Sequence, residues 1–239
     1  MPYNAINRLK ELVQASENIV FFGGAGVSTE SGIPDFRSVD GLYNSKYDYP
    51  PEQILSRSFF ENNPKEFYRF YFDKMIYEGK KPNACHLKLA KWEVSGKLSA
   101  VITQNIDGLH FDADSENVLE LHGSVRRNYC QKCGRFYHLS DILQGAPSVP
   151  YCECGGIIKP DVVLYEEALD DEVLRKSIEY IKDADLLIVG GTSLNVYPAA
   201  GLIGYAKAPI VIINKSITPY DRYAEIVVNQ PIGEVFELL

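Results

Sequence analysis

Four of the five cysteines lie in one short segment and form two pairs, in "YCQKCG" and "YCECGG", with the overall spacing C-x2-C-x18-C-x-C. Four thiolates on two such loops suit the tetrahedral coordination of Zn²⁺, and four protein ligands leave no position open for a substrate. We therefore predict a structural zinc site formed by Cys130, Cys133, Cys152 and Cys154.

The second cysteine pair is one residue shorter than the usual C-x2-C pair, which strains the chelate. Gly155 and Gly156 follow it and supply backbone freedom that relieves this strain. His138 lies between the two pairs and is an alternative ligand, while four unrelated buried cysteines are the alternative to a metal site. Cys85 lies outside the cluster on an expected helix, and we predict that it is a small core residue.

A glycine cluster follows an apolar run in the stretch "VFFGGAGVSTESGIPDFRS". Gly24 and Gly26 occupy the first two glycine positions of the dinucleotide fingerprint G-x-G-x-x-G, but Thr29 occupies the third. The backbone N–H groups of such a loop can hold a pyrophosphate, and a simple tight turn is the alternative. A hydride-transferring dehydrogenase needs the third glycine and an acidic residue that closes a second strand about 20 residues on. The segment "SVDGLYNSKYDYPP" contains no such strand.

Three further polar stretches each follow an apolar run. "ITQNIDGLH" carries Asn105 and Asp107, which suit a ribose or an amide, and "GGTSLNVYP" offers hydroxyl donors that suit a phosphate. "VLELHGS" carries His122, whose imidazole titrates near neutral pH and can act as a general base. Each stretch alone also fits a tight turn or a structural histidine. Together they predict a single crevice shared with the glycine loop.

The apolar runs predict the fold. Several are short and continuous, which is typical of strands buried on both faces of a parallel sheet. Helical spacing of apolar residues between several of these runs predicts a doubly wound α/β fold. The expected strands cover 18–24, 99–103, 161–165, 185–191, 209–214 and 225–228, and the expected helices cover 4–16 (with Asn4 as the N-cap), 83–97, 171–184 and 198–208.

Two segments interrupt this alternation. Residues 39–77 are rich in Tyr, Phe and Pro and contain a helical stretch with Pro64 in its first turn. Residues 128–156 hold the cysteine cluster. We predict a small domain made of the helical insertion 39–77 and the zinc module 128–156, and a Rossmann-like large domain made of 1–38, 78–127 and 157–239.

Composition limits the possible partners. The chain has 239 residues, of which 46% are hydrophobic and 23% charged, as in ordinary globular proteins. Its net charge of −8 argues against a nucleic-acid surface, which needs a basic patch, but is compatible with small molecules or basic peptides. The first residues lack the apolar region of a signal peptide, and no run reaches the roughly 18 apolar residues of a membrane span. We therefore expect a cytoplasmic monomer with neither membrane nor nucleic-acid partners.

The motifs also carry a family resemblance that covers nearly the whole chain. "GAGVSTESGIPDFR", "TQNIDGLH", "LELHGS", the four-cysteine module and "GGTSL" occur in the order and approximate spacing seen in sirtuins, the NAD-dependent protein deacylases. "GIIKPDVVLYEE" resembles the segment that leads back from the zinc module in bacterial sirtuins. The resemblance implies a Rossmann-like domain with a smaller lobe, in agreement with the two insertions.

The resemblance also implies roles for single residues. His122 is expected to be the general base, with Asn105 and Asp107 as further catalytic residues, and Val162 and Val163 are expected to pair with the substrate peptide as an added strand. The NAD site implied by the resemblance comprises Gly24, Ala25, Gly26, Thr29, Phe36, Arg37, Gln104, Asn105, Ile106, Asp107, His122, Thr192, Ser193, Asn214 and Ile232.

The family reaction implied by this resemblance is the removal of acetyl groups from lysine. The acetyl-lysine carbonyl oxygen attacks C1′ of the nicotinamide ribose, nicotinamide leaves, and His122 then helps to deprotonate a ribose hydroxyl. The hydroxyl attacks the imidate carbon, and water completes the release of lysine and O-acetyl-ADP-ribose. Family members that remove acidic acyl groups carry a Tyr-x-x-Arg pair, and here Tyr71 stands in place of the arginine, so acidic acyl groups should be poor substrates.

This chain departs from the family pattern after "GLH", where it reads "FDADSENV". Asp112 and Asp114 make this loop acidic, and we expect it to favour basic peptides near the entrance. Protein ADP-ribosylation at the same NAD site is the alternative activity. A non-enzymatic NAD-binding or zinc-dependent interaction module is a third interpretation, but it leaves His122, Asn105 and Asp107 together unexplained.

Overall fold

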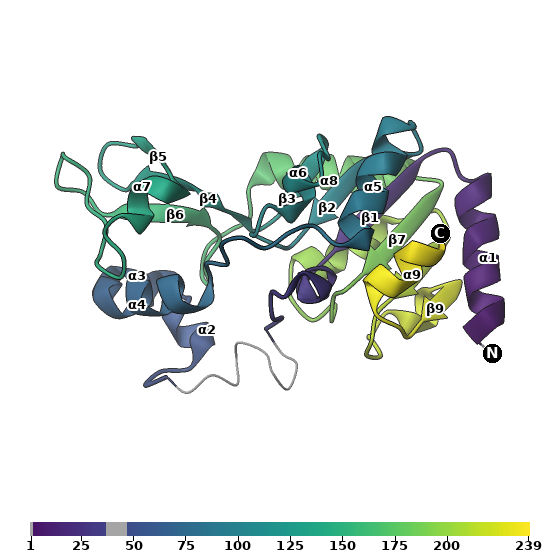
Figure 1. The fold of residues 1–239 in the computed structure, drawn as a ribbon, viewed down its shortest axis with the longest axis horizontal. Coiled ribbons are helices and arrows are strands. Elements are labelled where there is room, and N and C mark those ends of the chain that lie inside the picture. The colour runs from purple at the N-terminus through teal and green to yellow at the C-terminus, as the bar shows by residue number, and fades with distance from the viewer. Residues whose placement is uncertain (1, 37–46) are drawn as a thin grey trace.

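A six-stranded parallel sheet forms the larger of the two lobes in the computed structural model, which describes residues 2–36 and 47–239 (Figure 1). The strand order is β3-β2-β1-β7-β8-β9, which is the order of the dinucleotide-binding fold. All five strand pairings in this sheet are parallel. The strands are β1 (Ile19–Gly23), β2 (Leu98–Thr103), β3 (Val118–Glu120), β7 (Leu186–Gly190), β8 (Ile210–Ile213) and β9 (Ile226–Val228).

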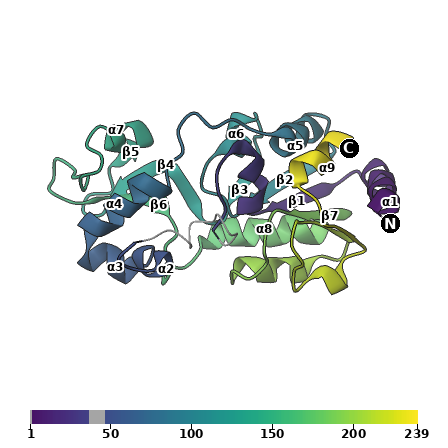
Figure 2. The same cartoon turned by 60° about the horizontal axis from the view of Figure 1, so that its bottom comes forward.

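Helices cover both faces of this sheet, as Figure 2 shows. The α-helices α1 (Pro2–Ala15), α5 (Ala84–Val94) and α9 (Ile232–Leu238) contribute to one core cluster, whereas α8 (Asp171–Asp183) and the 3-10 helix η4 (Ala199–Tyr205) contribute to another. Successive residues of β1 point to opposite faces, so Phe21 packs in the first cluster and Phe22 in the second. The expected parallel strands at 18–24, 99–103, 185–191, 209–214 and 225–228 are confirmed.

The smaller lobe combines the two predicted insertions in one core. Its antiparallel sheet has the order β5-β4-β6, with β4 (Gly123–Cys130), β5 (Phe136–His138) and β6 (Ile158–Val162), and α7 (Leu139–Leu143) follows β5. The helices α2 (Pro51–Ile54), α3 (Arg57–Asn62) and α4 (Pro64–Lys74) pack against this sheet around a shared hydrophobic cluster. The predicted α/β fold with a smaller second lobe is therefore confirmed, while its residue-level domain boundaries stay a prediction.

Local sequence explains the helices of the insertion. The hydroxyl of Ser56 caps α3 by accepting a hydrogen bond from the Phe59 N–H, at 3.2 Å. Pro64 starts α4, as predicted, because its fixed φ suits the first helical position and no intrahelical N–H is needed there. Tyr71 lies fully buried on the inner face of α4, so the aromatic residues of this segment form the core of the small lobe.

Three expectations about individual elements need correction. Residues 161–165 do not add a strand to the parallel sheet: β6 ends at Val162 and pairs antiparallel with β4. The run is apolar because the small-lobe core covers it. Helix α1 begins at Pro2, so Asn4 is not its N-cap. The predicted helix at 198–208 is a 3-10 helix, whose sequence is interrupted by Gly201 and Gly204.

In the described part of the chain, no helix combines the length and apolarity needed to cross a membrane.

Helix α9 packs against the core of the large lobe, and this packing can be tested by mutation. Phe236 on α9 is fully buried, and its ring centroid lies 5.9 Å from that of Phe21 and 5.5 Å from that of Trp92. We expect Phe236→Ala to lower the free energy of unfolding by about 3–5 kcal/mol, because it removes an aromatic ring and leaves a cavity. Urea unfolding followed by circular dichroism measures this change. Phe111→Ala is the control, since Phe111 is 40% exposed, and an equal loss in both variants would contradict the assignment.

Candidate active site

A cleft of about 910 Å³ lies at the carboxyl ends of the parallel strands, where it also meets the small lobe. Parallel sheets of this order place ligands at the carboxyl ends of their strands. The four motif stretches therefore meet in one crevice, as predicted. The described residues that were predicted for the NAD and peptide sites and that line the cleft are Gly24, Ala25, Gly26, Thr29, Phe36, Gln104, Asn105, Ile106, Asp107, His122, Val162, Val163, Thr192, Ser193, Asn214 and Ile232. Arg37 lies outside the described residues.

The glycine loop after β1 packs directly against the loop after β7. Gly24 N–H donates to Gly190 O at 3.2 Å, and Gly26 N–H donates to Gly191 O at 2.7 Å. A Cβ atom added at Gly26 would lie 2.8 Å from Gly191 Cα, so no other residue fits there. These two N–H groups bond to the end of β7 and to the residue after it, so the glycines let two backbones approach. A contact between this loop and the NAD pyrophosphate stays a prediction.

The missing third glycine has a structural explanation. The chain after Gly24 makes two successive 3-10 turns, η1 (Ala25–Val27) and η2 (Thr29–Ser31), instead of entering a long helix that must pack on the sheet. The Thr29 hydroxyl donates to Gly26 O at 2.9 Å and so stabilises these turns. Asn83, which caps α5, donates from its side-chain amide to Val27 O at 2.7 Å and holds the loop from outside.

Ser28 joins two of the predicted catalytic residues, although nothing in the sequence marks it as a site residue. Its hydroxyl donates to Asp107 Oδ2 at 2.7 Å and accepts from Asn105 Nδ2 at 3.0 Å. Ser28 and Asn105 are only 1% and 6% exposed, so these bonds are shielded from water. A serine in a glycine-rich loop gives no distinctive signal, because its role depends on partners about 80 residues away in the sequence.

Burial and the neighbouring groups shift the pKa of Asp107 in opposite directions. Burial raises the pKa of this carboxyl, while the Leu109 N–H at 2.9 Å, the Ser28 hydroxyl and the positive charge of Arg126 lower it. The net direction is upward, yet two donors already point at the carboxylate oxygens. Asp107 is therefore arranged as a hydrogen-bond acceptor at the wall of the cleft.

The predicted base, His122, is held in one tautomer. Its Nδ1 lies 3.0 Å from Gln104 O, and because a carbonyl can only accept, Nδ1 carries the proton and Nε2 keeps a lone pair. Burial lowers the pKa of His122, so the ring is neutral at neutral pH. Gln104 also reaches the opposite loop, since its Nε2 donates to Thr192 Oγ1 at 3.1 Å.

The segment after β6 is fixed from both sides. Val163 N–H donates to His122 O at 3.0 Å, which ties this segment to the predicted base. The buried Lys159 ammonium donates to Val162 O at 2.8 Å and lies 3.1 Å from Glu167 Oε2. Burial lowers the pKa of Lys159, and Glu167 opposes that shift by favouring the charged form.

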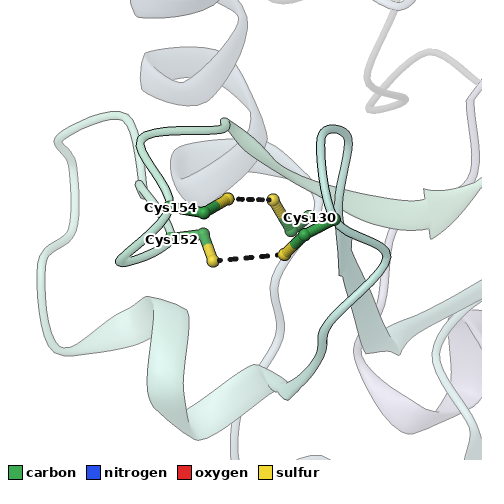
Figure 3. Close-up of side chains that lie close together, drawn as sticks. Cys130, Cys152 and Cys154 are labelled. Atoms are coloured by element: carbon green, nitrogen blue, oxygen red, sulfur yellow. Dashed lines mark hydrogen bonds between the residues drawn. The ribbon is translucent and has the colours of Figure 1, made fainter.

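The four cysteines converge as a metal site requires (Figure 3). The Sγ atoms of Cys130 and Cys154 lie 3.4 Å apart, those of Cys133 and Cys152 lie 3.7 Å apart, and all four lie within 4.8 Å of one another. A tetrahedron with Zn–S bonds of about 2.3 Å has edges of about 3.8 Å, so the set fits Zn²⁺. The ion would join the two loops, and with four protein ligands it would serve the fold and not the chemistry.

One alternative raised by the sequence does not hold. His138 caps α7, and its ring packs edge-on against Phe136 with centroids 4.7 Å apart, so it is not among the metal-ligand atoms of the cysteine cluster. Asp112 forms an ion pair with Arg126, with the shortest N···O distance 2.5 Å, while the preference of the acidic loop for basic peptides stays a prediction. Cys85 is a buried core residue, as predicted.

The fold, the paired glycine loops and the cleft histidine define the class of this protein. A family model described as "Sir2 family" matches residues 24–198, and the chain belongs to that family. It is 57% identical to the NAD-dependent protein deacetylase of Clostridium acetobutylicum over 97% of this chain and 96% of that protein. It is 60% identical to the NAD-dependent protein deacetylase of Clostridium perfringens over 96% of each chain.

Solved Sir2 structures share the whole fold. One, described as the structural basis for the mechanism and regulation of Sir2 enzymes, has a TM-score of 0.90 at 40% identity and covers 98% of this chain and 96% of its own. Another, of Sir2 with a p53 peptide and NAD+, has a TM-score of 0.86 at 38% identity over 97% of this chain and 95% of that one. At this level of similarity the likeness extends to both lobes.

The zinc assignment is tested by removing one ligand. Cys130 and Cys152 belong to the small-lobe core, so loss of the metal should loosen that lobe. We expect Cys130→Ser to reduce the bound zinc from about one ion per chain to near zero and to make the small lobe sensitive to proteases. Mass spectrometry of the metal and limited proteolysis measure both effects. Cys85→Ala, the control, should keep its zinc; full zinc occupancy in Cys130→Ser would refute the site.

Proposed function

We propose that this chain is an NAD-dependent protein lysine deacetylase. It transfers the acetyl group of acetyl-lysine to ADP-ribose and releases nicotinamide, lysine and O-acetyl-ADP-ribose. The observation that carries the proposal is the fixed tautomer of His122, whose Nδ1–H donates to Gln104 O and whose Nε2 is left as a base in the cleft. The membership in the Sir2 family and the deacetylase relatives support the same activity.

The residues divide the cleft into regions for two substrates. When bound, NAD supplies the ribose carbon from which nicotinamide departs. The paired loops that contain Gly26 and Thr192 would hold its phosphates, and Asn214 and Ile232, which also line the cleft, would hold the adenosine. Asn105 and Asp107, joined through Ser28, would hold the nicotinamide carboxamide and the adjacent ribose.

The peptide substrate is expected along the segment after β6. Val162 and Val163 line the cleft, and the hydrogen bond from Val163 to His122 O fixes their distance from the base. Pairing of an extended peptide with this segment would bring an acetyl-lysine side chain inward toward His122. Phe36, which also lines the cleft, would exclude water from the reacting groups.

Replacement of the base tests the proposal most directly. We expect His122→Ala to slow peptide deacetylation by a factor of about 10² or more, because a positioned general base contributes this much. Mass spectrometry of an acetyl-lysine peptide incubated with NAD measures the loss of the acetyl group, and an ADP-ribose adduct would reveal the alternative transferase activity. His138→Ala, at an exposed histidine outside the cleft, is the control. Wild-type protein that yields neither nicotinamide nor deacetylated peptide would refute the proposal.

The pH dependence of deacetylation follows from the state of His122. Burial lowers its pKa below the ordinary value of 6.5, and the neutral form is the base. The base form is therefore present at pH 6.5 and is lost only as the pH falls through the lowered pKa. We expect the acid midpoint of kcat to lie below about 6.5, measured as the pH profile of deacetylation at saturating NAD and peptide. A midpoint clearly above that value contradicts the assignment.

A further inference from the structure

A second, smaller cavity of about 210 Å³ lies behind Asp107. Asp107 lines both this cavity and the main cleft, together with Ile33, Met75 and Tyr77, and it is the only ionised side chain of these four. Most of the other lining residues come from α6 (Leu109–Asp112), β4 and the turn after α4, and Ile33 and Leu139 complete the lining. The charged ones are Glu78, Lys80, Asp112 and Arg126, so the rear of Asp107 faces charges and not only apolar side chains.

Arg126 is the most firmly held of these charges. Its Nη1 and Nη2 atoms donate to Asp112 Oδ1 and Oδ2 at 2.8 and 2.5 Å, which is a bidentate pair that fixes the plane of the guanidinium. The same group lies against Gly108, where an added Cβ would come within 2.3 Å of Arg126 Nε. Because Gly108 follows Asp107 directly, Arg126 packs against the backbone that positions this carboxylate.

The charges around Asp107 come from several elements. Arg126 on β4 opposes the effect of burial on the pKa of Asp107, whereas Asp112 on α6 adds to it. Glu78 and Lys80 line the same cavity from the turn after α4, and His122 lines the cleft on the other side. His110, also on α6, is buried against His86, and burial lowers the pKa of both, so they add no charge at neutral pH.

We propose that Arg126, clamped by Asp112, is a positioning residue for Asp107: it fixes the backbone after Asp107 and supplies the positive charge that keeps this carboxylate in its acceptor form. The inference rests on the proposed function, in which Asp107 accepts a hydrogen bond from the carboxamide of nicotinamide. A protonated carboxyl group loses part of that capacity. Arg126 then acts through Asp107, from outside the cleft, since it lines only the rear cavity. In this proposal Asp112, where the chain differs from the family pattern, serves to hold Arg126 in place.

The first readout is the pKa of Asp107 itself, measured by ¹³C NMR of carboxyl-labelled protein and assigned with Asp107→Asn. We expect Arg126→Gln to raise this pKa by roughly 0.5 to 1 unit, a modest shift because Arg126 is partly exposed. Arg126→Lys keeps the charge and should stay near the wild-type value. Arg175→Gln removes a similar cation and ion pair from the surface of α8 and should leave it unchanged.

The second readout is the exchange of labelled nicotinamide into NAD in the presence of an acetyl-lysine peptide, followed over pH. Exchange reports the departure and return of nicotinamide, before His122 acts as a base. We expect the acid limb of exchange to move to higher pH in Arg126→Gln by about the same 0.5 to 1 unit, and to return in Arg126→Lys. Thermal melting confirms that each variant is folded.

The outcomes separate the two proposals. An unchanged pKa of Asp107 in folded Arg126→Gln overturns the inference, as does a loss of exchange that is uniform over pH, which is the mark of a merely structural role. If Arg126→Gln does not fold, Arg126→Lys decides: an acid limb displaced by about a full unit despite the retained charge overturns the inference, and a wild-type limb supports it. Wild-type protein without exchange or deacetylation refutes the proposed function, while the NMR titration still decides the role of Arg126.

Discussion

The contact between two glycine loops at the centre of the parallel sheet is the constraint on which the site depends. Gly26 N–H donates to Gly191 O, and neither backbone could approach the other if a side chain intervened. This contact lies where the strand order reverses, between β1 and β7, and so brings together segments that are far apart in sequence. Thr192 is thereby placed within reach of Gln104, and Gln104 in turn holds His122. This backbone contact thus helps to position Thr192, Gln104 and His122 in the cleft.

Much of this arrangement could be predicted, because parallel strands impose simple rules. Polar residues that follow buried strands must meet at one edge of the sheet, and the positions of Asn105, His122 and Thr192 obey this rule. Paired cysteines at metal-ligand spacing have few other uses in a reducing environment, and their Sγ atoms do converge. In both cases a local pattern in the sequence carries the information, and the fold adds only the distances.

What could not be predicted depends on partners distant in sequence. Ser28 is one hydroxyl among many until Asp107 and Asn105 are placed beside it. The run at 161–165 has the apolar character of a central strand, because burial by the helices of the small lobe leaves the same signature as burial within a parallel sheet. Asp112 reads as a free acidic residue, and only the position of β4 reveals that Arg126 compensates it. Composition and spacing indicate which residues are buried and which chemical groups they carry, but they do not identify the residues that these groups contact.

The order of elements along the chain has a consequence for synthesis. The first strand of the large lobe, β1, packs its Phe21 against Phe236, which lies more than 200 residues later in the sequence. The small-lobe core, in contrast, is complete once residue 164 has been made. During translation the cysteine-bearing small lobe can therefore fold first. The apolar side chains of β1 stay incompletely buried until α9 has been synthesised. The ribosome must synthesise the chain as far as α9 before the large-lobe side of the cleft is complete.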